Sequence, residues 1–189
     1  TGAIMVSVAE KEDIESYGVT SGADVTASIA QAGSFDYNES SDGPNDARGD
    51  VAAVNLRELG GGNTLVLLNG RRMTPHPVAQ DINQTPTSVV NVNTLPVGAI
   101  DRVEVLRDGA SALYGADATG GVINTVLDPD YDGLRLELLH YNSEGTDYQN
   151  YSGRISGGWT LNGGRTRLIA FGGYYTRDGM MASERDYME

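Results

Sequence analysis

The last third of the sequence alternates apolar and polar residues in three segments. In the first, Leu134, Leu136 and Leu138 alternate with polar residues, and segments 151–160 and 165–175 repeat the pattern between turns rich in Gly, Asn and Asp. A period of two predicts β-strands with one apolar face. Strands of about nine to eleven residues with aromatic side chains near their ends are typical of the wall of an outer-membrane β-barrel. An ordinary soluble antiparallel sheet fits the alternation equally well, so both interpretations stay open at this point.

The charge of the chain excludes several classes of partner. The 189 residues include 26 acidic and 13 basic side chains, which gives a net charge of −13. Nucleic acids and anionic membrane surfaces attract clustered Lys and Arg, so we expect neither as a partner. The chain has no Cys, which excludes disulfides and thiolate metal sites. No apolar run approaches the roughly 18 residues of a membrane-spanning helix.

The first two thirds of the sequence predict short strands and helices. Ser21 can cap a helix that runs to Gln31 or Ala32, and Asn69-Gly70 predicts a tight turn because both residues tolerate positive φ. The apolar run 64–70 does not alternate, which predicts a strand buried on both faces. The other expected elements are strands at 4–8, 53–59, 100–106 and 121–127 and helices at 10–16 and 110–114.

Two long polar segments separate these elements. Residues 34–50 show no periodicity and are rich in Asp, Asn and Ser. Residues 73–91 contain three prolines, which oppose regular structure. We expect both segments to be exposed loops.

No segment predicts a catalytic, metal or nucleotide site. The run DPDYDG (128–133) begins like a calcium loop, but Leu139 stands where the bidentate acid of such a loop belongs. The glycines at 109–115 have the spacing of a phosphate-binding loop without its Lys and Ser or Thr. His76 and His140 have no acid at a useful spacing, and no nucleophile motif is present. We therefore predict that the chain is not an enzyme and holds neither a metal nor a cofactor.

Three segments resemble a known family. VNLRELGGGNTLVLLNGRRM (54–73), NTLPVGAIDRVEVLRDGASALYGADATGGVINTVL (93–127) and IMVSVAEKEDIESYG (4–18) are similar to the plug domain of TonB-dependent outer-membrane receptors. The resemblance covers about residues 3–127, and its second half is the most specific part. A barrel of about 22 strands encloses a lumen too wide for side chains to fill, and such transporters carry a folded plug.

The resemblance implies a fold and a division of the chain. We expect an α/β (α+β) plug domain with a small mixed β-sheet and short helices at residues 1–127, and a linker at 128–133. Residues 134–189 would be the first antiparallel strands of a transmembrane β-barrel. A wall of about 22 strands needs on the order of 220 residues, whereas 62 residues follow Leu127. We therefore expect the chain to be a fragment of a longer receptor.

The resemblance also implies a function. The plug would gate a receptor in the bacterial outer membrane that imports a scarce, bulky nutrient such as a siderophore, cobalamin or a glycan. The expected partners are TonB, through a segment upstream of this chain, the remaining β-barrel, the imported ligand and outer-membrane lipid.

Individual residues acquire expected roles from the same resemblance. Arg107 would pair with barrel carboxylates outside this chain. Gly109, Gly115, Gly120 and Gly121 would serve turns and close packing. The loops 34–50 and 73–91 would lie near the ligand, and the candidate ligand contacts within them, which combine aromatic rings with hydrogen-bond donors, are Phe35, Tyr37, Arg48, Arg72, His76 and Gln80.

The principal alternative is a soluble periplasmic or extracellular binding module whose last strands complete a water-soluble β-sheet. The exterior of these strands distinguishes the two possibilities. Apolar and aromatic side chains on one face, without a covering partner, favour a membrane wall.

Overall fold

The computed structural model describes residues 6–29, 34–37, 51–82, 85–107 and 109–178. The chain divides into two compact units, Thr1–Pro129 and Asp130–Glu189, and each is described by itself. The division lies within the predicted linker 128–133, and the finer domain boundaries stay a prediction.

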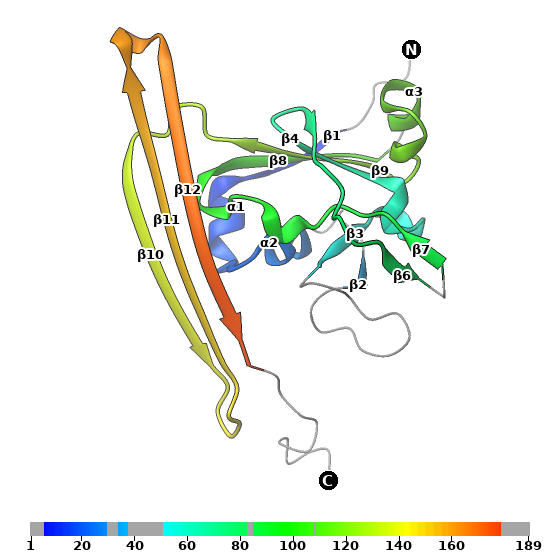
Figure 1. Ribbon diagram of the computed structural model, residues 1–189, viewed down its shortest axis with the longest axis horizontal. Coiled ribbons are helices and arrows are strands. Elements are labelled where there is room, and N and C mark those ends of the chain that lie inside the picture. Colours follow the sequence, from blue (N-terminus) through cyan, green and yellow to red (C-terminus); the bar gives the residue numbers. More distant parts are fainter. Residues whose placement is uncertain (1–5, 30–33, 38–50, 83–84, 108, 179–189) are drawn as a thin grey trace. The chain divides into compact units, whose positions relative to one another are not determined.

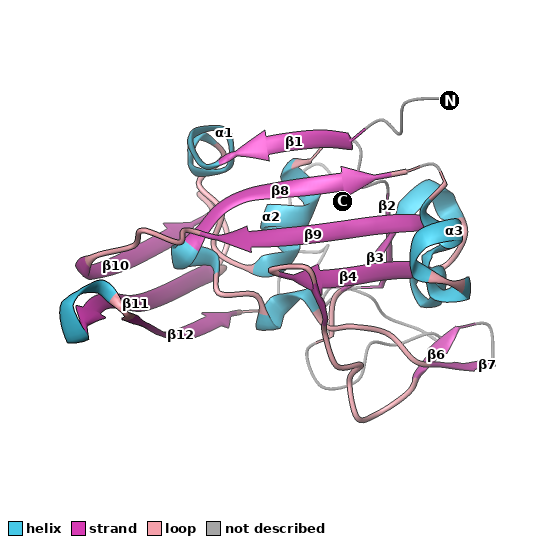
Figure 2. Ribbon diagram, turned by 90° about the horizontal axis from the view of Figure 1, so that it is seen from above, coloured by secondary structure: helices cyan, strands magenta, loops and turns pink. Residues whose placement is uncertain are grey.

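The first unit contains a five-stranded sheet in the order β1-β8-β9-β4-β5. Figure 2 shows β1, β8, β9 and β4 side by side in this order. Its strands are β1 (Val6–Glu10), β4 (Thr64–Leu68), β5 (Arg71–Arg72), β8 (Ile100–Leu106) and β9 (Gly121–Leu127). β4 runs parallel to β9 and the other neighbours are antiparallel, so the predicted small mixed sheet is confirmed. The predicted turn at Asn69-Gly70 joins β4 to β5, and both of its residues have positive φ.

Both faces of β4 are buried, as its unalternating apolar sequence predicts. Val66 contributes to a large core that includes side chains of α1 (Lys11–Ser16) and α2 (Gly22–Ser28). Leu65 and Leu67 contribute to a smaller core with Ala110 of α3 (Ala110–Tyr114). Helical segments therefore pack on both sides of this strand, which holds the sheet in place.

A capping box sets the start of α2. The Ser21 hydroxyl accepts a hydrogen bond from the Asp24 amide at 3.1 Å, and the Asp24 carboxylate accepts bonds from the amides of Ser21 at 2.9 Å and Thr20 at 2.8 Å. This arrangement confirms the predicted N-cap. Burial favours the neutral form of Asp24, but the hydrogen bonds from Thr20 and Ser21 together outweigh burial and lower the pKa of this carboxyl.

The end of α2 differs from the prediction. The helix stops at Ser28 and Ile29 is extended, whereas the sequence predicts a helix to Gln31 or Ala32. The Ser28 hydroxyl donates to the Val25 carbonyl oxygen at 2.7 Å, and such bonds compete with helix continuation. Residues 30–33 lie outside the described residues.

The two segments expected to be irregular contain short strands, so the prediction is wrong there. β2 (Ser34–Tyr37) pairs with β3 (Ala53–Asn55), and β6 (Gln80–Ile82) pairs with β7 (Thr85–Thr87). β7 contains a proline, which is tolerated because a two-stranded sheet consists only of edge strands. β3 is shorter than its predicted range, since a 3₁₀ turn (Leu56–Glu58) follows it directly.

The second unit is a three-stranded antiparallel sheet in the order β10-β11-β12 (Figure 1). Its strands are β10 (Gly133–Asn142), β11 (Gln149–Leu161) and β12 (Thr166–Arg177). The three predicted strands are confirmed. Among the described residues, no helix has the length and apolar character needed to cross a membrane.

Candidate functional site

Gly120 and Gly121 at the start of β9 form, with Leu56, a contact that we call the glycine notch. A Cβ added to Gly121 would lie 2.7 Å from the Leu106 carbonyl oxygen and 2.8 Å from Leu56 Cδ1, and Gly121 has a φ of +135°. A Cβ on Gly120 would lie 3.1 Å from the Leu56 carbonyl oxygen. Leu56 is fully buried, so the notch fixes the loop after β3 against the ends of β8 and β9.

The other two predicted glycines have open surroundings. Gly109 and Gly115 flank α3 with φ values of +69° and +89°, and no atom beyond their chain neighbours lies within 4 Å of an added Cβ. Their side-chain positions face free space, so their contribution comes from the turn conformation alone. The four glycines therefore differ in what a substitution would disturb.

The loop beside the notch brings two arginines together. Arg57 Nη1 donates a hydrogen bond to the Arg107 carbonyl oxygen at 3.3 Å, and both side chains are exposed. Arg57 and Glu58 have φ values of 62° and 57°, in the left-handed region that ordinary residues rarely adopt. The turn at these residues directs the Arg57 guanidinium to the end of β8, next to the position from which Arg107 projects.

The left-handed Glu58 gives a stability prediction. We expect Glu58→Gly to raise the free energy of unfolding by up to about 1 kcal/mol, because glycine adopts this conformation without the steric cost. Urea unfolding midpoints of the two proteins would measure the change. The control is Leu59→Gly at the next residue, where φ is −90° and glycine should destabilise instead. Equal shifts in both variants would contradict the role of backbone strain.

Arg72 of β5 binds the α3 segment. Its Nη1 atom lies 2.6 Å from Asp117 Oδ2, and Nη2 donates to the Tyr114 carbonyl oxygen. The side chains of Arg72 and Asp117 are 49% and 67% exposed, so the pair is open to solvent. Arg72, one of the predicted ligand contacts, is thus exposed to solvent, and its contacts with Asp117 and Tyr114 fix its position in the first unit.

His76 lies between β5 and β6, and Gln80 is the first residue of β6. The His76 amide donates to the Val89 carbonyl oxygen at 2.7 Å, and its half-buried ring places Nδ1 2.9 Å from the Val78 carbonyl oxygen. Gln80 is fully buried and its Nε2 donates to the same carbonyl at 3.0 Å. The backbone of this segment is therefore held internally, and Gln80 reaches a ligand only if the segment moves.

Of the remaining candidates, Phe35 and Tyr37 belong to β2, and Arg48 lies outside the described residues. Ligand contact by all six residues stays a prediction.

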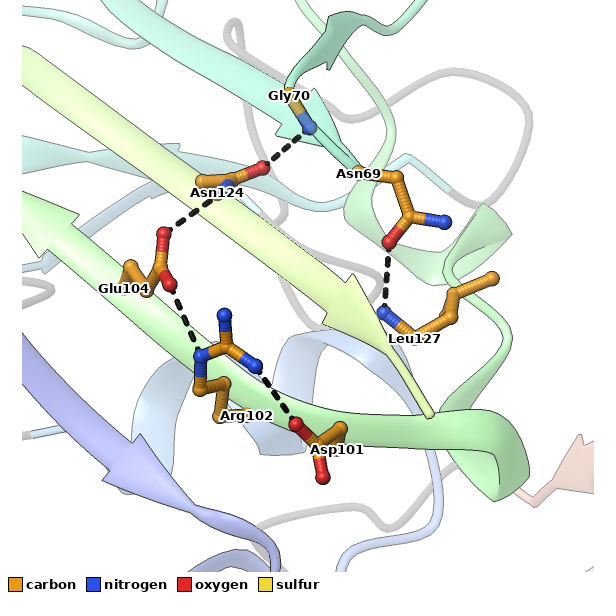
Figure 3. Close-up of polar contacts among 7 residues, drawn as sticks. All are labelled: Asn69, Gly70, Asp101, Arg102, Glu104, Asn124 and Leu127. Atoms are coloured by element: carbon orange, nitrogen blue, oxygen red, sulfur yellow. Dashed lines mark hydrogen bonds and ion pairs between the residues drawn. The ribbon is translucent and has the colours of Figure 1, made fainter. Parts of the chain in front are cut away.

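A chain of polar contacts that the sequence does not predict crosses the sheet (Figure 3). On β8, Arg102 binds Asp101 Oδ2 through Nη1 at 2.7 Å and Glu104 Oε1 through Nε at 2.9 Å. Asn124 of β9 donates to Glu104 Oε2 at 2.9 Å and accepts from the Gly70 amide at 2.9 Å. The hydrogen bonds to Asp101 and then Glu104 raise the pKa of Arg102. The alternation of charges on β8 indicates a wet strand face, but no local signal identifies the partner strands.

The second unit has two chemically different faces. Register pairing places nine large side chains, each between 45% and 76% exposed, on one face: Leu134, Leu136, Leu138, Tyr151, Ile155, Trp159, Leu161, Leu168 and Tyr174. The opposite face bears Arg135, Glu137 and Arg154, in which Glu137 pairs with Arg135 at 2.7 Å and with Arg154 at 2.8 Å. One face therefore carries most of the exposed apolar side chains, whereas the other carries the paired charges together with Phe171, which is 51% exposed.

The first unit, with its mixed sheet and short helices, and the two-sided strands after it match a known class of protein. The sequence model of the family described as "TonB-dependent Receptor Plug Domain" matches residues 2–122. The chain belongs to this family, which consists of outer-membrane transporters and not of enzymes. Membership confirms the predicted family and class of protein, and it removes the support for a soluble binding module.

Several relatives are similar to parts or most of the chain. The iron-regulated outer membrane virulence protein of Vibrio cholerae serotype O1 is 37% identical over 82 residues, which are 43% of this chain and 12% of that protein. The siderophore receptor PirA of Acinetobacter baumannii matches 90% of this chain and 24% of its own, with 21% identity and a TM-score of 0.59. A mutant ferric enterobactin receptor (PfeA) of Pseudomonas aeruginosa, solved with enterobactin, matches 95% of this chain and 26% of its own, with 20% identity and a TM-score of 0.64. At these identities the solved structures establish a shared fold, and the chain spans about a quarter or less of each relative.

Proposed function

We propose that this chain is the plug and the first wall strands of an outer-membrane receptor that imports a ferric siderophore. The observation that carries the proposal is the family match over residues 2–122 followed by a sheet whose exposed face is apolar. The names of the similar receptors favour a siderophore over cobalamin or a glycan, which the sequence alone leaves equally open. The apolar face of β10–β12 would contact lipid, and the polar face would line the lumen.

In this proposal the first unit blocks the pore until TonB pulls on a segment upstream of it. The plug has to change position or shape for a ligand to pass, because a folded domain fills the lumen of so wide a barrel. Arg107 would pair with carboxylates of the remaining wall, and the hydrogen bond from Arg57 to its carbonyl oxygen supports a fixed position for it. Arg72 and His76 would be the ligand contacts best supported by their placement, since neither is fully buried.

Iron uptake tests the proposed function. The receptor that carries this chain would be produced in a bacterial strain without its own siderophore receptors, and accumulation of radioactive iron supplied as ferric enterobactin or another ferric siderophore would be measured. We expect uptake in cells with TonB and none in otherwise identical cells without it. Failure to take up any ferric siderophore, or uptake that does not depend on TonB, would contradict the proposal.

A further inference from the structure

The segment that enters the second unit lies across the polar face of its sheet. The Tyr131 hydroxyl and the Ser156 hydroxyl of β11 are 2.5 Å apart, and the Asp130 carboxylate pairs with the Arg167 guanidinium of β12. Register pairing places Ser156 opposite Arg135, on the polar face. Residues 130–132 therefore contact two strands of the sheet that they precede.

Gly158 of β11 shows how closely this segment lies on the sheet. A Cβ added to Gly158 would be 2.0 Å from the Tyr131 carbonyl oxygen and 2.7 Å from its carbonyl carbon. Both neighbours are backbone atoms, which cannot rotate away as a flexible side chain can. Gly133, which pairs with Gly158, has a φ of +96° and so lets the chain turn into β10. The fit between the Tyr131 backbone and β11 requires glycine at position 158.

The same segment follows the last strand of the first unit with almost no intervening chain. The Asp128 amide donates to the Ala99 carbonyl oxygen at 2.9 Å, directly beyond β9. Pro129 alone separates Asp128 from Asp130, which already contacts Arg167. The connection between the two units is therefore short in sequence. Asp128 is hydrogen-bonded within the first unit, and Asp130 is ion-paired within the second.

We propose that residues 130–132 act as a strap that stays fixed on the polar face of β10–β12, and so anchors the chain that follows β9, while other parts of the plug rearrange. This inference rests on the proposed function, in which β10–β12 begin the barrel wall. The exposed pair of Asp130 and Arg167, whose side chains are 79% and 47% exposed, contributes little to the strap. The contact of Tyr131 with Ser156 and Gly158 holds the strap in place, because Ser156 is buried and Gly158 leaves no room for a side chain.

Digestion by an endoproteinase that cleaves before aspartate tests the strap. Asp128, Asp130 and Asp132 supply cleavage sites in this segment, and a protease needs a locally detached chain to reach them. With the full chain in detergent micelles, we expect Gly158→Ala to raise the initial cleavage rate within 128–132 about tenfold. The matched control is Gly173→Ala, on the same polar face of β12, where the nearest atom to an added Cβ is 3.8 Å away. The control should be cleaved at the wild-type rate.

A second variant decides the outcome if Gly158→Ala does not fold. Tyr131→Phe removes only the hydroxyl that meets Ser156, and we expect it to raise the cleavage rate about threefold with an unchanged far-ultraviolet spectrum. The proposal of a strap is overturned if Gly158→Ala folds and is cleaved at the wild-type rate. If Gly158→Ala does not fold, the proposal is overturned when Tyr131→Phe is cleaved at the wild-type rate. Cleavage is measured without iron uptake, so failure of the strap and failure of the proposed function give separate results.

Discussion

Replacing Gly121 by alanine is expected to lower the free energy of unfolding of the first unit by about 3 kcal/mol or more, from backbone strain and overpacking together. At a φ of +135° a residue with a Cβ is strained in any surroundings. The added atom would also meet the Leu106 carbonyl oxygen at 2.7 Å and Leu56 Cδ1 at 2.8 Å, and the carbonyl belongs to a paired strand. Urea titration followed by hydrogen exchange of the amides of β8 and β9 would measure the loss.

Gly109→Ala is the matched control for this prediction. Gly109 also has positive φ, at +69°, but no atom beyond its chain neighbours lies within 4 Å of its added Cβ. Gly109→Ala should therefore lower the free energy of unfolding only through backbone strain, by about 1 kcal/mol. Equal losses for the two variants would show that the notch imposes no steric demand, and would contradict the packing of Leu56 described above.

Leu168→Arg is expected to make insertion of the receptor into lipid less favourable, because an arginine on the lipid face of a barrel costs up to about 2–4 kcal/mol at the bilayer midplane and less toward the interfaces. Leu168 lies on the apolar face of β12, opposite Trp159. The cost arises because the guanidinium loses its hydration in hydrocarbon, whereas leucine gains from the transfer. Folding of the complete receptor into phospholipid vesicles at increasing urea would measure it.

Phe171→Arg gives a comparison on the same strand. Phe171 is 51% exposed, as is Leu168, but it lies on the polar face opposite Ser156. A sheet surrounded by water would tolerate the two substitutions about equally, since equal exposed areas are affected. A membrane wall penalises Leu168→Arg much more. Similar insertion of the two variants would contradict the assignment of the apolar face to lipid.

Local signals account for the parts of the fold that the sequence predicts correctly. Ser21 and Asp24 are three residues apart, and the Asn69-Gly70 turn needs only its own two residues, so each can be recognised without knowing the rest of the structure. β2 and β6 have only four and three residues, and each is stabilised by pairing with another segment. Short strands of this kind carry no period long enough to be recognised, so the sequence predicts loops at both places.

The site shows the same limit. The sequence resemblance groups Gly120 and Gly121 with Gly109 and Gly115, and only the three-dimensional contacts separate a steric role from a purely conformational one. Arg72 and Asp117 are 45 residues apart, and their ion pair depends on how β5 and the segment after α3 pack. Pairings between distant segments are set by the whole fold and leave no mark on either segment alone.

The order of strands in the plug sheet has a mechanical consequence. Among the described residues β1 is bonded along one side only, to β8, through five residue pairs, whereas β9 is bonded to both β8 and β4. A tensile load that enters the sheet ahead of Val6 therefore meets a single ladder. β1 can therefore detach from the edge of the sheet by losing only its hydrogen bonds to β8. The other four strands keep all the hydrogen bonds that they make with one another.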